Sequence, residues 1–452
     1  MADAGRRGRL EALFRAAVAG ADPHRFTTQA LRRRLADLDG ARRLWLVALG
    51  KCAAPMSAAA LAALERDGRA PSGGVIVAPS PIPSPHPALE VRVGDHPVPG
   101  EGSLAAARAL GALAERVGAD DAVVLLLSGG ASSLAAAPVS GIAPEDQRAL
   151  FALLLGSGLD IARTNVVRRR VARWGAGRLA AALAPARVLP IVVSDVPGDD
   201  AAVIGSGPCT PDPTRAADVV RLLAAAGLEA RVPAGVRSYL LAAVRGEISE
   251  TPKPGDAAFA AVLAAELLPH GVALDGAAAA ARALGMAALV RREPLEGEAA
   301  ERGVRLAAEL LLMSRELALV PGAARTPLAV VWGGETTVTL PDAGGGAGGR
   351  CQELALAAAG ALARDARARP VALALLAAGT DGRDGPTDAA GAVVDATTWD
   401  RVREAGRDPE LDLSRHDSYR ALDAAGALLR TGATGTNVMD VVIALLDAPA
   451  AR

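Results

Sequence analysis

The sequence is poor in aromatic residues and in cysteine. Aromatic side chains make up only 2% of its 452 residues, which argues against a surface on which nucleobases stack. The three cysteines lie far apart, without the spacing of a zinc site or of a disulfide framework. The net charge is −1, so neither nucleic acid nor an anionic membrane is expected as a main partner. These absences favour a small-molecule ligand.

Long uncharged apolar segments are also missing. A membrane-spanning helix needs about 18 or more consecutive apolar residues, and every stretch of that length carries charge. The arginines near the N-terminus are not followed by the apolar segment of a signal peptide. We therefore expect a cytoplasmic protein. The sequence leaves the oligomeric state open, and a homodimer is compatible with it.

Short apolar runs alternate with helix-like segments along the whole chain. Such runs are typical of strands that are buried on both faces of a parallel sheet. The clearest of them cover residues 44–49, 122–127, 188–193, 328–331, 371–376 and 441–445. We predict an α/β protein with two domains, each a mostly parallel sheet flanked by helices. Residues 1–250 form the larger, Rossmann-like domain and residues 251–452 the second.

Two glycine-rich stretches could present backbone N–H groups to an anion. The first, Ser128-Gly129-Gly130-Ala131-Ser132-Ser133, follows an apolar run, and the second, residues 344–349, precedes a helix-like segment. Glycines after a strand allow close approach of the backbone, and the positive end of a following helix favours a phosphate. Neither stretch is a Walker A loop or a GxGxxG fingerprint in its usual setting. Both indicate a bound anion and nothing finer.

Several charged residues follow predicted strands, where ligands of such sheets gather. Lys51 ends the first buried strand and could place its ammonium group over the sheet, or simply be solvated. Arg350 opens a helix, where its charge opposes the helix dipole, and its guanidinium group could bind a carboxylate or phosphate. Asp195 and Asp381 suit Mg²⁺, but equally suit turn or N-cap hydrogen bonds. The basic segment 168–170 could be solvated, pair with acidic loops or bind an anionic substrate.

Taken together, the motifs resemble the glycerate 2-kinase family, whose members carry a MOFRL region. The resemblance runs through nearly the whole chain. Its residues are Ala48 to Lys51, Gly94 to Pro99, Leu127 to Ser133, Val193 to Asp199, Ile204 to Pro208, Thr251 to Asp256, Gly333 to Val338, Gly348 to Arg350, Gly379 to Gly382, Gly385 to Gly391 and Thr434 to Val438. The resemblance implies two α/β domains with the active site in the cleft between them, and a MOFRL region at about residues 328–446. It also implies transfer of phosphate from ATP, with Mg²⁺, to the 2-hydroxyl of D-glycerate.

The same resemblance implies roles for individual residues. Lys51 and Arg350 match residues that are essential for activity in the family, and Asp195 matches a loop at the cleft. We expect Lys51 and Arg350 to face each other across the cleft, with Asp195 orienting the hydroxyl group or the metal. Asp195 and Asp381 are the expected metal ligands. The expected cofactor-binding residues are Ser128, Gly129, Gly130, Ser132, Ser133, Gly348, Gly349 and Glu335.

The chain departs from the family pattern at several positions. Cys351 replaces the asparagine of GGRNQE, Ala433 replaces the proline of TGPTGTN, and Ala347 stands where a basic residue is common. The usual Lys-Gly-Gly appears as Gly175-Ala176-Gly177. Two other interpretations therefore stay open. The chain could be a hydroxypyruvate reductase, although it lacks a dinucleotide fingerprint after its first strand, or a protein that binds a sugar acid without catalysis.

Overall fold

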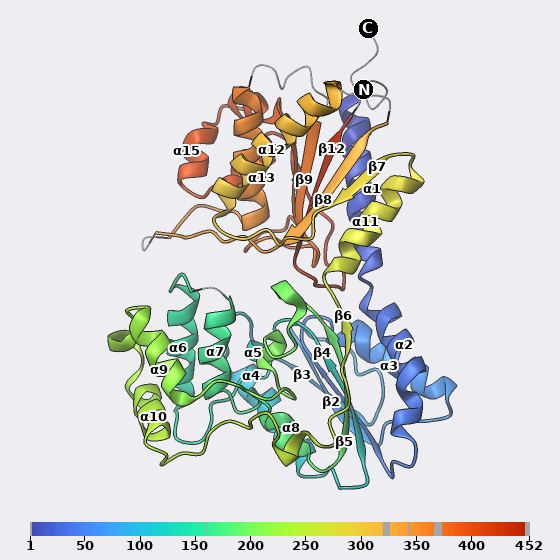
Figure 1. Ribbon diagram of the computed structural model, residues 1–452, viewed down its shortest axis with the longest axis vertical. Helices are drawn as coiled ribbons and strands as arrows, with labels where there is room; N and C mark the ends of the chain where they lie inside the picture. The colour runs from blue at the N-terminus through green and yellow to red at the C-terminus, as the bar shows by residue number, and fades with distance from the viewer. Residues whose placement is uncertain (1, 160, 320–325, 342–343, 366–372, 448–452) are drawn as a thin grey trace. The chain divides into compact units, whose positions relative to one another are not determined.

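The computed structural model describes residues 2–159, 161–319, 326–341, 344–365 and 373–447 (Figure 1). The chain forms two compact units. Residues 23–268 make one, here called the N-terminal unit. Residues 1–22 join residues 269–452 in the other, the C-terminal unit. The chain thus passes from one unit to the other at Asp22–Pro23 and again at Leu268–Pro269.

This division differs from the expected one at residue 250 because the first helix belongs to the C-terminal unit. Helix α1 (Ala2–Gly20) packs against α11 (Gly271–Ala283). Gly20 and Gly276 allow this approach, since a Cβ atom on Gly276 would lie 2.7 Å from the Ala16 carbonyl oxygen. Residues 248–256 lie inside the N-terminal unit, where Thr251 Oγ1 donates to Asp212 Oδ2 at 2.9 Å.

The N-terminal unit is built on a six-stranded sheet whose strands are all parallel. In spatial order the strands are β3 (Leu89–Val93), β2 (Gly73–Ala78), β1 (Leu44–Leu49), β4 (Ala122–Leu127), β5 (Arg187–Val193) and β6 (Glu266–Leu268). The order changes direction between β1 and β4. Doubly wound sheets bind ligands at such a switch point, beyond the carboxyl ends of the strands. The order occurs in dinucleotide-binding sheets as well, so it does not identify the ligand.

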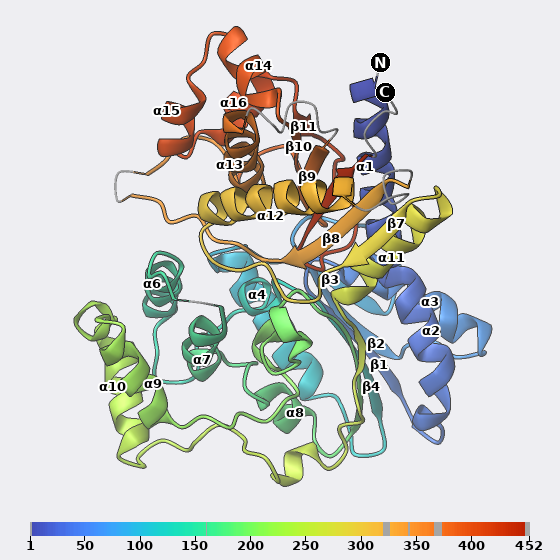
Figure 2. The ribbon, with the colours of Figure 1, turned by 45° about the horizontal axis from the view of Figure 1, so that its top comes forward.

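Helices cover both faces of this sheet (Figures 1 and 2). Trp45, Val47 and Leu49 share a core cluster with residues of α4 (Glu101–Ala114) and α8 (Arg178–Leu183). Leu46 and Ala48 point the opposite way and are also fully buried. Burial of both faces explains the continuous apolar run of β1. The remaining helices of this unit are α2 (Pro23–Arg34), α3 (Ala53–Arg66), α5 (Ala131–Leu134), α6 (Pro144–Leu155), α7 (Ile161–Val171), α9 (Ala216–Ala225) and α10 (Ala234–Val244).

The C-terminal unit corrects the prediction of a second mostly parallel sheet. Its six strands run β11 (Leu428–Leu429), β10 (Gly391–Asp395), β9 (Leu373–Gly379), β12 (Asp440–Leu446), β8 (Leu328–Gly334) and β7 (Ala287–Val290). Only β7 and β8 are parallel. The segment 380–390 joins β9 to β10 without the helix that a parallel crossover usually requires. The apolar pattern did not reveal this, because strands buried on both faces look alike in either orientation.

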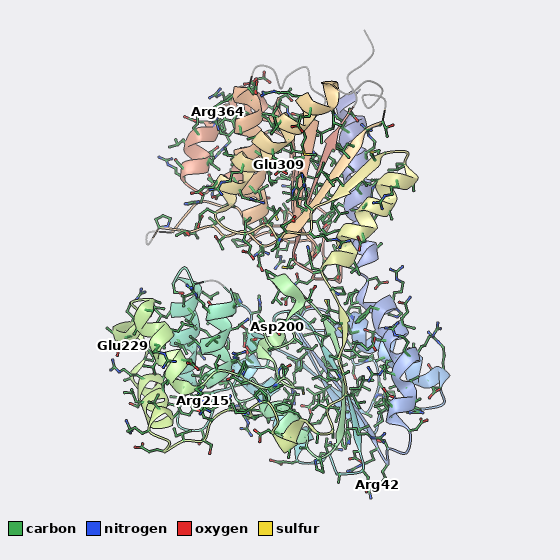
Figure 3. All side chains as sticks on the ribbon, viewed as in Figure 1. Arg42, Asp200, Arg215, Glu229, Glu309 and Arg364 are labelled. Atoms are coloured by element: carbon green, nitrogen blue, oxygen red, sulfur yellow. The ribbon has the colours of Figure 1, made fainter. Side chains whose placement is uncertain are left out.

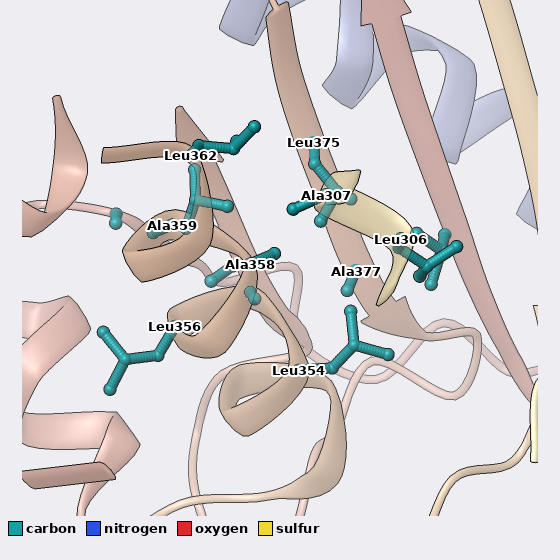
Figure 4. Packing of buried hydrophobic residues seen from close by; sticks show 14 of the residues in the cluster. Leu306, Ala307, Leu354, Leu356, Ala358, Ala359, Leu362, Leu375 and Ala377 are labelled. Carbon is teal, nitrogen blue, oxygen red and sulfur yellow. The ribbon is translucent and has the colours of Figure 1, made fainter. Parts of the chain in front are cut away.

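The core of the C-terminal unit lies between its sheet and two long helices, α12 (Ala299–Leu319) and α13 (Arg350–Arg364). Figure 4 shows Leu306 and Ala307 of α12 beside Leu375 and Ala377 of β9, with Leu354 of α13 nearby. Helix α13 thereby fixes the position of its first residue, Arg350. The other helices of this unit are α14 (Thr398–Glu404), α15 (Pro409–Ser414) and α16 (Ser418–Ala424).

The predicted α/β class is confirmed, with one sheet parallel and the other mostly antiparallel. Charged side chains such as Arg42, Arg215 and Glu229 are exposed on the N-terminal unit, and Arg364 is exposed on the C-terminal unit (Figure 3). Within the described part of the chain, every helix is too short or too polar to span a bilayer.

Candidate functional site

In the N-terminal unit, the turns after β1 and β4 are joined at the switch point of the sheet. Ser128 N donates to the Leu49 carbonyl oxygen at 2.9 Å, and Lys51 N donates to the Gly129 carbonyl oxygen at 2.9 Å. Cys52 N donates to Ser128 Oγ, also at 2.9 Å. Gly50 has φ +122°, and a Cβ atom there would lie 2.3 Å from Ser128 Oγ. Only glycine allows this approach, which holds Lys51 against the first glycine-rich stretch.

The stem of Lys51 lies beside Gly130 and His96. A Cβ atom on Gly130, which has φ +83°, would lie 3.5 Å from Lys51 Cγ and 3.2 Å from His96 Cδ2. His96 follows β3 and is joined to Pro97 by a cis peptide bond. Ser133 Oγ donates to the Pro97 carbonyl oxygen at 2.8 Å. Segments that follow β1, β3 and β4 therefore meet around the side chain of Lys51, a partly buried residue.

Lysine is rare in this chain, which makes its presence at residue 51 informative. The sequence has 49 lysine and arginine residues, of which only Lys51 and Lys253 are lysine. Lys253 has a structural place, since its Nζ donates to Thr251 Oγ1 at 2.7 Å and lies 3.3 Å from Glu250 Oε2. Lys51 follows the end of β1, and a lysine there supplies a compact charge, whereas an arginine would supply a planar guanidinium group with a different hydrogen-bonding pattern.

A third segment at this edge is the turn Ile204–Pro208. Gly205, Ser206 and Gly207 have φ of 58°, 64° and 58°, so a serine occupies the left-handed region between two glycines. Such a residue costs of order 1–3 kcal/mol. Ser206 is buried, and its Oγ lies 2.7 Å from Ser132 Oγ. The turn thus brings a second hydroxyl group to the first glycine-rich stretch.

Asp195 follows β5 at the same edge and is partly buried. The neighbouring Asp200 has a local role, because its Oδ1 accepts a hydrogen bond from Ala202 N at 2.8 Å. The position of Asp195 agrees with the prediction that it follows a strand. Its expected roles in orienting a hydroxyl group or a metal stay predictions.

The basic segment of α7 is mostly structural. Arg169 Nη2 lies 2.9 Å from Asp212 Oδ1, and Arg170 is fully buried and paired with Glu250. Arg168 stacks on the ring of Phe151, 4.9 Å from its centroid, and burial lowers the pKa of this guanidinium group. Of the three interpretations of this segment, pairing with acidic loops holds for two of its arginines.

In the C-terminal unit, carboxylates surround Arg350. Arg350 Nε donates to Asp440 Oδ2 at 2.6 Å, and its Nη2 donates to Asp440 Oδ1 at 3.1 Å. Its Nη1 donates to Glu335. Burial lowers the pKa of Arg350, but the attraction of Asp440 and Glu335 outweighs it and raises the pKa well above its ordinary value. About a third of the Arg350 side chain stays exposed, at 35%.

The start of α13 is capped by a carboxylate from a distant segment. Asp384 Oδ1 accepts from Cys351 N at 3.1 Å, and its Oδ2 accepts from Gln352 N at 2.8 Å. A Cβ atom on Gly349 would lie 2.3 Å from Asp384 Cγ, so glycine is needed for this approach. Burial and the charge of Asp440 raise the pKa of Asp384 to about 7. The sequence predicted a bound anion at the start of this helix. At the N–H groups of Cys351 and Gln352, the side chain of Asp384 takes that place.

The second glycine-rich stretch is held by its own unit. Gly346 N donates to the Arg415 carbonyl oxygen at 2.7 Å, and Ala347 N donates to Asp417 Oδ1 at 2.9 Å. Asp381 lies in the loop after β9, and its Oδ1 accepts from Arg383 N at 3.0 Å. A Cβ atom on Gly379 would lie 3.2 Å from Asp381 Oδ1 and 3.5 Å from Asp440 Oδ1. Asp381 thus lies on the same side of β9 and β12 as the Arg350 cluster.

The sequence interpretation missed Asp440 and gave no role to Ser206. Asp440 is buried at the start of β12, where a carboxylate opens an otherwise apolar strand. That position was a usable signal, because a buried carboxylate needs a cationic partner. Among the residues that the structure describes, no group of three or more His, Cys, Asp or Glu side chains could hold a metal ion.

The chain is thus an α/β protein of two units. One has a parallel sheet with a lysine-bearing turn, and the other has an arginine-carboxylate cluster. A family model described as "Domain of unknown function (DUF4147)" matches residues 9–241, and the "MOFRL family" model matches residues 328–440. The second match falls within the MOFRL region predicted from the sequence.

Known proteins match the chain over nearly their whole length. A putative hydroxypyruvate reductase of Agrobacterium vitis is 39% identical, with 96% of this chain and 92% of the relative covered. A glycerate 2-kinase of Pyrococcus horikoshii is 34% identical, with 96% of each covered. A D-glycerate 2-kinase of Thermotoga maritima is 36% identical, with 93% of this chain and 94% of the relative covered. The crystal structure of a glycerate kinase from T. maritima matches with a TM-score of 0.79 at 34% identity, covering 98% of this chain and 99% of the other. The chain belongs to the glycerate 2-kinase family.

Proposed function

We propose that the protein is a glycerate 2-kinase, which transfers the γ-phosphoryl group of ATP to the 2-hydroxyl group of D-glycerate. The kinases of P. horikoshii and T. maritima support this activity by their similarity over nearly the full chain. The structural observation that carries the proposal is the junction of Lys51 with the Ser128–Gly130 turn at the switch point of the parallel sheet. There, a cation and backbone N–H groups lie where such sheets bind phosphorylated ligands.

Phosphoryl transfer requires positioning and positive charge more than covalent chemistry from the protein. In the proposal, Lys51 and the N–H groups of residues 129–132 neutralise the phosphate oxygens from the N-terminal unit, and Ser128 and Ser133 contribute their side chains. Arg350 contributes a guanidinium group from the C-terminal unit, with Glu335, Gly348 and Gly349 beside it at the nucleotide. The proposal keeps the expectation from the sequence that both cations act on the transferring group when the substrates are bound.

The proposal assigns Mg²⁺ to Asp195 and Asp381. Mg²⁺ usually takes one or two protein carboxylates together with phosphate oxygens and waters, and the proposal supplies two carboxylates, one after β5 and one after β9. Bound Mg²⁺ would neutralise charge on the phosphates of ATP. Asp195 would also orient the 2-hydroxyl group of the acceptor through a hydrogen bond.

The decisive experiment identifies the product made from ATP and D-glycerate. Enolase converts 2-phosphoglycerate directly to phosphoenolpyruvate, whereas 3-phosphoglycerate requires a mutase first. We expect the enolase-coupled signal without added mutase. A signal that appears only after mutase is added would contradict transfer to the 2-hydroxyl group, and the absence of ADP formation would contradict kinase activity.

The name of the A. vitis relative supplies a second candidate activity, reduction of hydroxypyruvate. A reductase would consume NADH when hydroxypyruvate is present. We expect no consumption, because no GxGxxG motif follows the first strand of the parallel sheet, and the GxGxxG spacing of residues 344–349 lies in the C-terminal unit. The cytoplasmic location belongs to the same proposal, since the reaction needs a supply of ATP. The homodimer stays a prediction, which light scattering of the purified protein can test.

A further inference from the structure

We propose that Ser206 and Ser132 form a subsite for the uncharged hydroxymethyl group of the acceptor, and that Ser206 determines the preference for an acceptor with this second hydroxyl group. The inference rests on the proposed kinase function and goes beyond it by naming a residue that recognises the substrate. All the residues concerned lie in the N-terminal unit.

The subsite is a pocket beside the Lys51 turn. It is lined by Leu49, the last residue of β1, by Ser132 of α5, and by Ala136, Trp174, Ser206 and Pro208 among others. None of the described residues that line it is charged. Trp174 Nε1 already donates to the Ala107 carbonyl oxygen at 3.0 Å. The polar side-chain groups that remain for a ligand are the two serine hydroxyls.

The chemistry of this lining selects a neutral hydroxyl group over a carboxylate or phosphate. A desolvated anion would need a cation or several donors, and the pocket walls offer apolar groups and two hydroxyls. Ser132 Oγ and Ser206 Oγ lie 2.7 Å apart, so one O–H donates within the pair. The pair keeps one further donor and several lone pairs. It can therefore donate to and accept from a third hydroxyl group at the same time.

The backbone gives independent support. Ser206 lies in the left-handed region at φ 64°, where glycine is preferred, and the residues on both sides of it are glycine. The turn is firmly held, because Ala176 N donates to the Ser206 carbonyl oxygen and Gly177 N donates to the Gly207 carbonyl oxygen, both at 2.8 Å. A serine that occupies an unfavourable backbone conformation and lines a pocket beside a second serine is better explained by ligand binding than by stability.

The geometry also agrees with the proposed reaction. Leu49 lines the pocket, and Lys51 follows it by two residues across the Gly50 turn. An acceptor whose hydroxymethyl group occupies the pocket would direct the rest of its short carbon chain toward the turn that carries Lys51. The reacting hydroxyl group of a three-carbon acid would then lie next to the proposed phosphate site.

The test compares D-glycerate with D-lactate, which has a methyl group in place of the hydroxymethyl group. The variant is Ser206→Gly, which removes the hydroxyl and suits the left-handed backbone. Since loss of one hydrogen bond corresponds to about a tenfold effect, we expect kcat/KM for D-glycerate to fall about tenfold or more. The value for D-lactate should stay unchanged, and the thermal midpoint should stay the same or rise.

Ala176→Gly is the matched control. Ala176 is also buried and left-handed, at φ 55°, and packs beside Ser206 without a polar side chain. It should leave the ratio of the two kcat/KM values unchanged. An unchanged ratio in Ser206→Gly, or an equal shift in Ala176→Gly, would overturn the proposal. Calorimetric titration with D-glycerate in the absence of ATP keeps the subsite testable if no phosphorylation occurs, because Ser206→Gly should then weaken binding of D-glycerate but not of D-lactate.

Discussion

Asp440 offers a direct test of how Arg350 is positioned. The carboxylate accepts hydrogen bonds from Nε and Nη2 of Arg350 at 2.6 Å and 3.1 Å, and its side chain is only 9% exposed. In Asp440→Asn, one carboxylate oxygen becomes an NH₂ group that faces a guanidinium N–H. One charge-assisted hydrogen bond is then lost, together with the negative charge. Glu335 still accepts from Arg350, so the guanidinium group keeps one of its two carboxylate partners.

The magnitude follows from this geometry. A hydrogen bond to a charged group contributes about 1.5–3 kcal/mol. The remaining Glu335 contact and the partial exposure of Arg350 reduce this to about 1–2 kcal/mol, which corresponds to about 5–30-fold. We expect kcat/KM for D-glycerate to fall by that factor in Asp440→Asn. Arg350→Ala removes the guanidinium group itself and should cost on the order of 10²–10⁴.

A double-mutant cycle shows whether Asp440 acts by positioning Arg350 or affects activity independently of Arg350. If Asp440 acts through Arg350, then Asp440→Asn should cost almost nothing more in an Arg350→Ala background. A full additional loss in that background would refute the reasoning. Asp423→Asn is the surface control, because Asp423 pairs with Arg430 at 2.8 Å while about half of its side chain, 52%, is exposed. It should retain wild-type kinetics.

Three further predictions concern other residues of the proposed site. Lys51→Ala should lower kcat/KM by on the order of 10²–10⁴. In a Lys253→Arg protein, whose only lysine is Lys51, an amine-modifying reagent should abolish activity unless MgATP protects the enzyme. Modification of Lys51 without loss of activity would contradict its role in binding the phosphate. Because the pKa of Asp384 is raised to about 7, the folded state binds this proton more tightly than the unfolded state, so its contribution to the free energy of unfolding should decline from about pH 4 to about pH 7. The free energy of unfolding, measured with urea at pH 5 and pH 8, should differ less between the two pH values in Asp384→Asn than in the wild type. An equal difference in both proteins would contradict the raised pKa of Asp384. Asp195→Asn should raise the Mg²⁺ concentration required for half-maximal activity, measured at fixed ATP, and an unchanged requirement would remove Asp195 from the metal site.

The sequence allowed the parallel sheet to be predicted because each of its central strands is an uninterrupted apolar run. It also placed Lys51 and the Ser128–Ser133 stretch at strand ends, and the structure brings them together through the Lys51–Gly129 hydrogen bond. The predicted topology of the second sheet was wrong, because the relative direction of two strands depends on the segment that connects them. The sequence of the 380–390 connection shows no helix-like segment, and this could have been used to predict that β9 and β10 are antiparallel.

The contacts within the site were harder to predict because they join distant residues. Asp440 lies 90 residues from Arg350 in the chain, and Asp384 lies 33 residues from the N–H group of Cys351 that it caps. No local pattern encodes such pairs. They depend on β9 and β12 being neighbours in the sheet and on α13 packing over β9 and β10. Ser206 presents the same difficulty, since only the fold reveals its contact with Ser132.

The Arg350 cluster explains how a helix can begin with arginine. The positive end of α13 and the guanidinium charge would repel each other, but Asp440 and Glu335 neutralise the guanidinium group and Asp384 accepts from the helix N–H groups. One positive side chain therefore faces two or three negative ones, depending on whether Asp384 is protonated. Such a cluster by itself does not attract a phosphate group. Arg350 can orient an anion, but the charge that draws the anion in must come from elsewhere, which is the physical reason why the proposed reaction requires Lys51 as well.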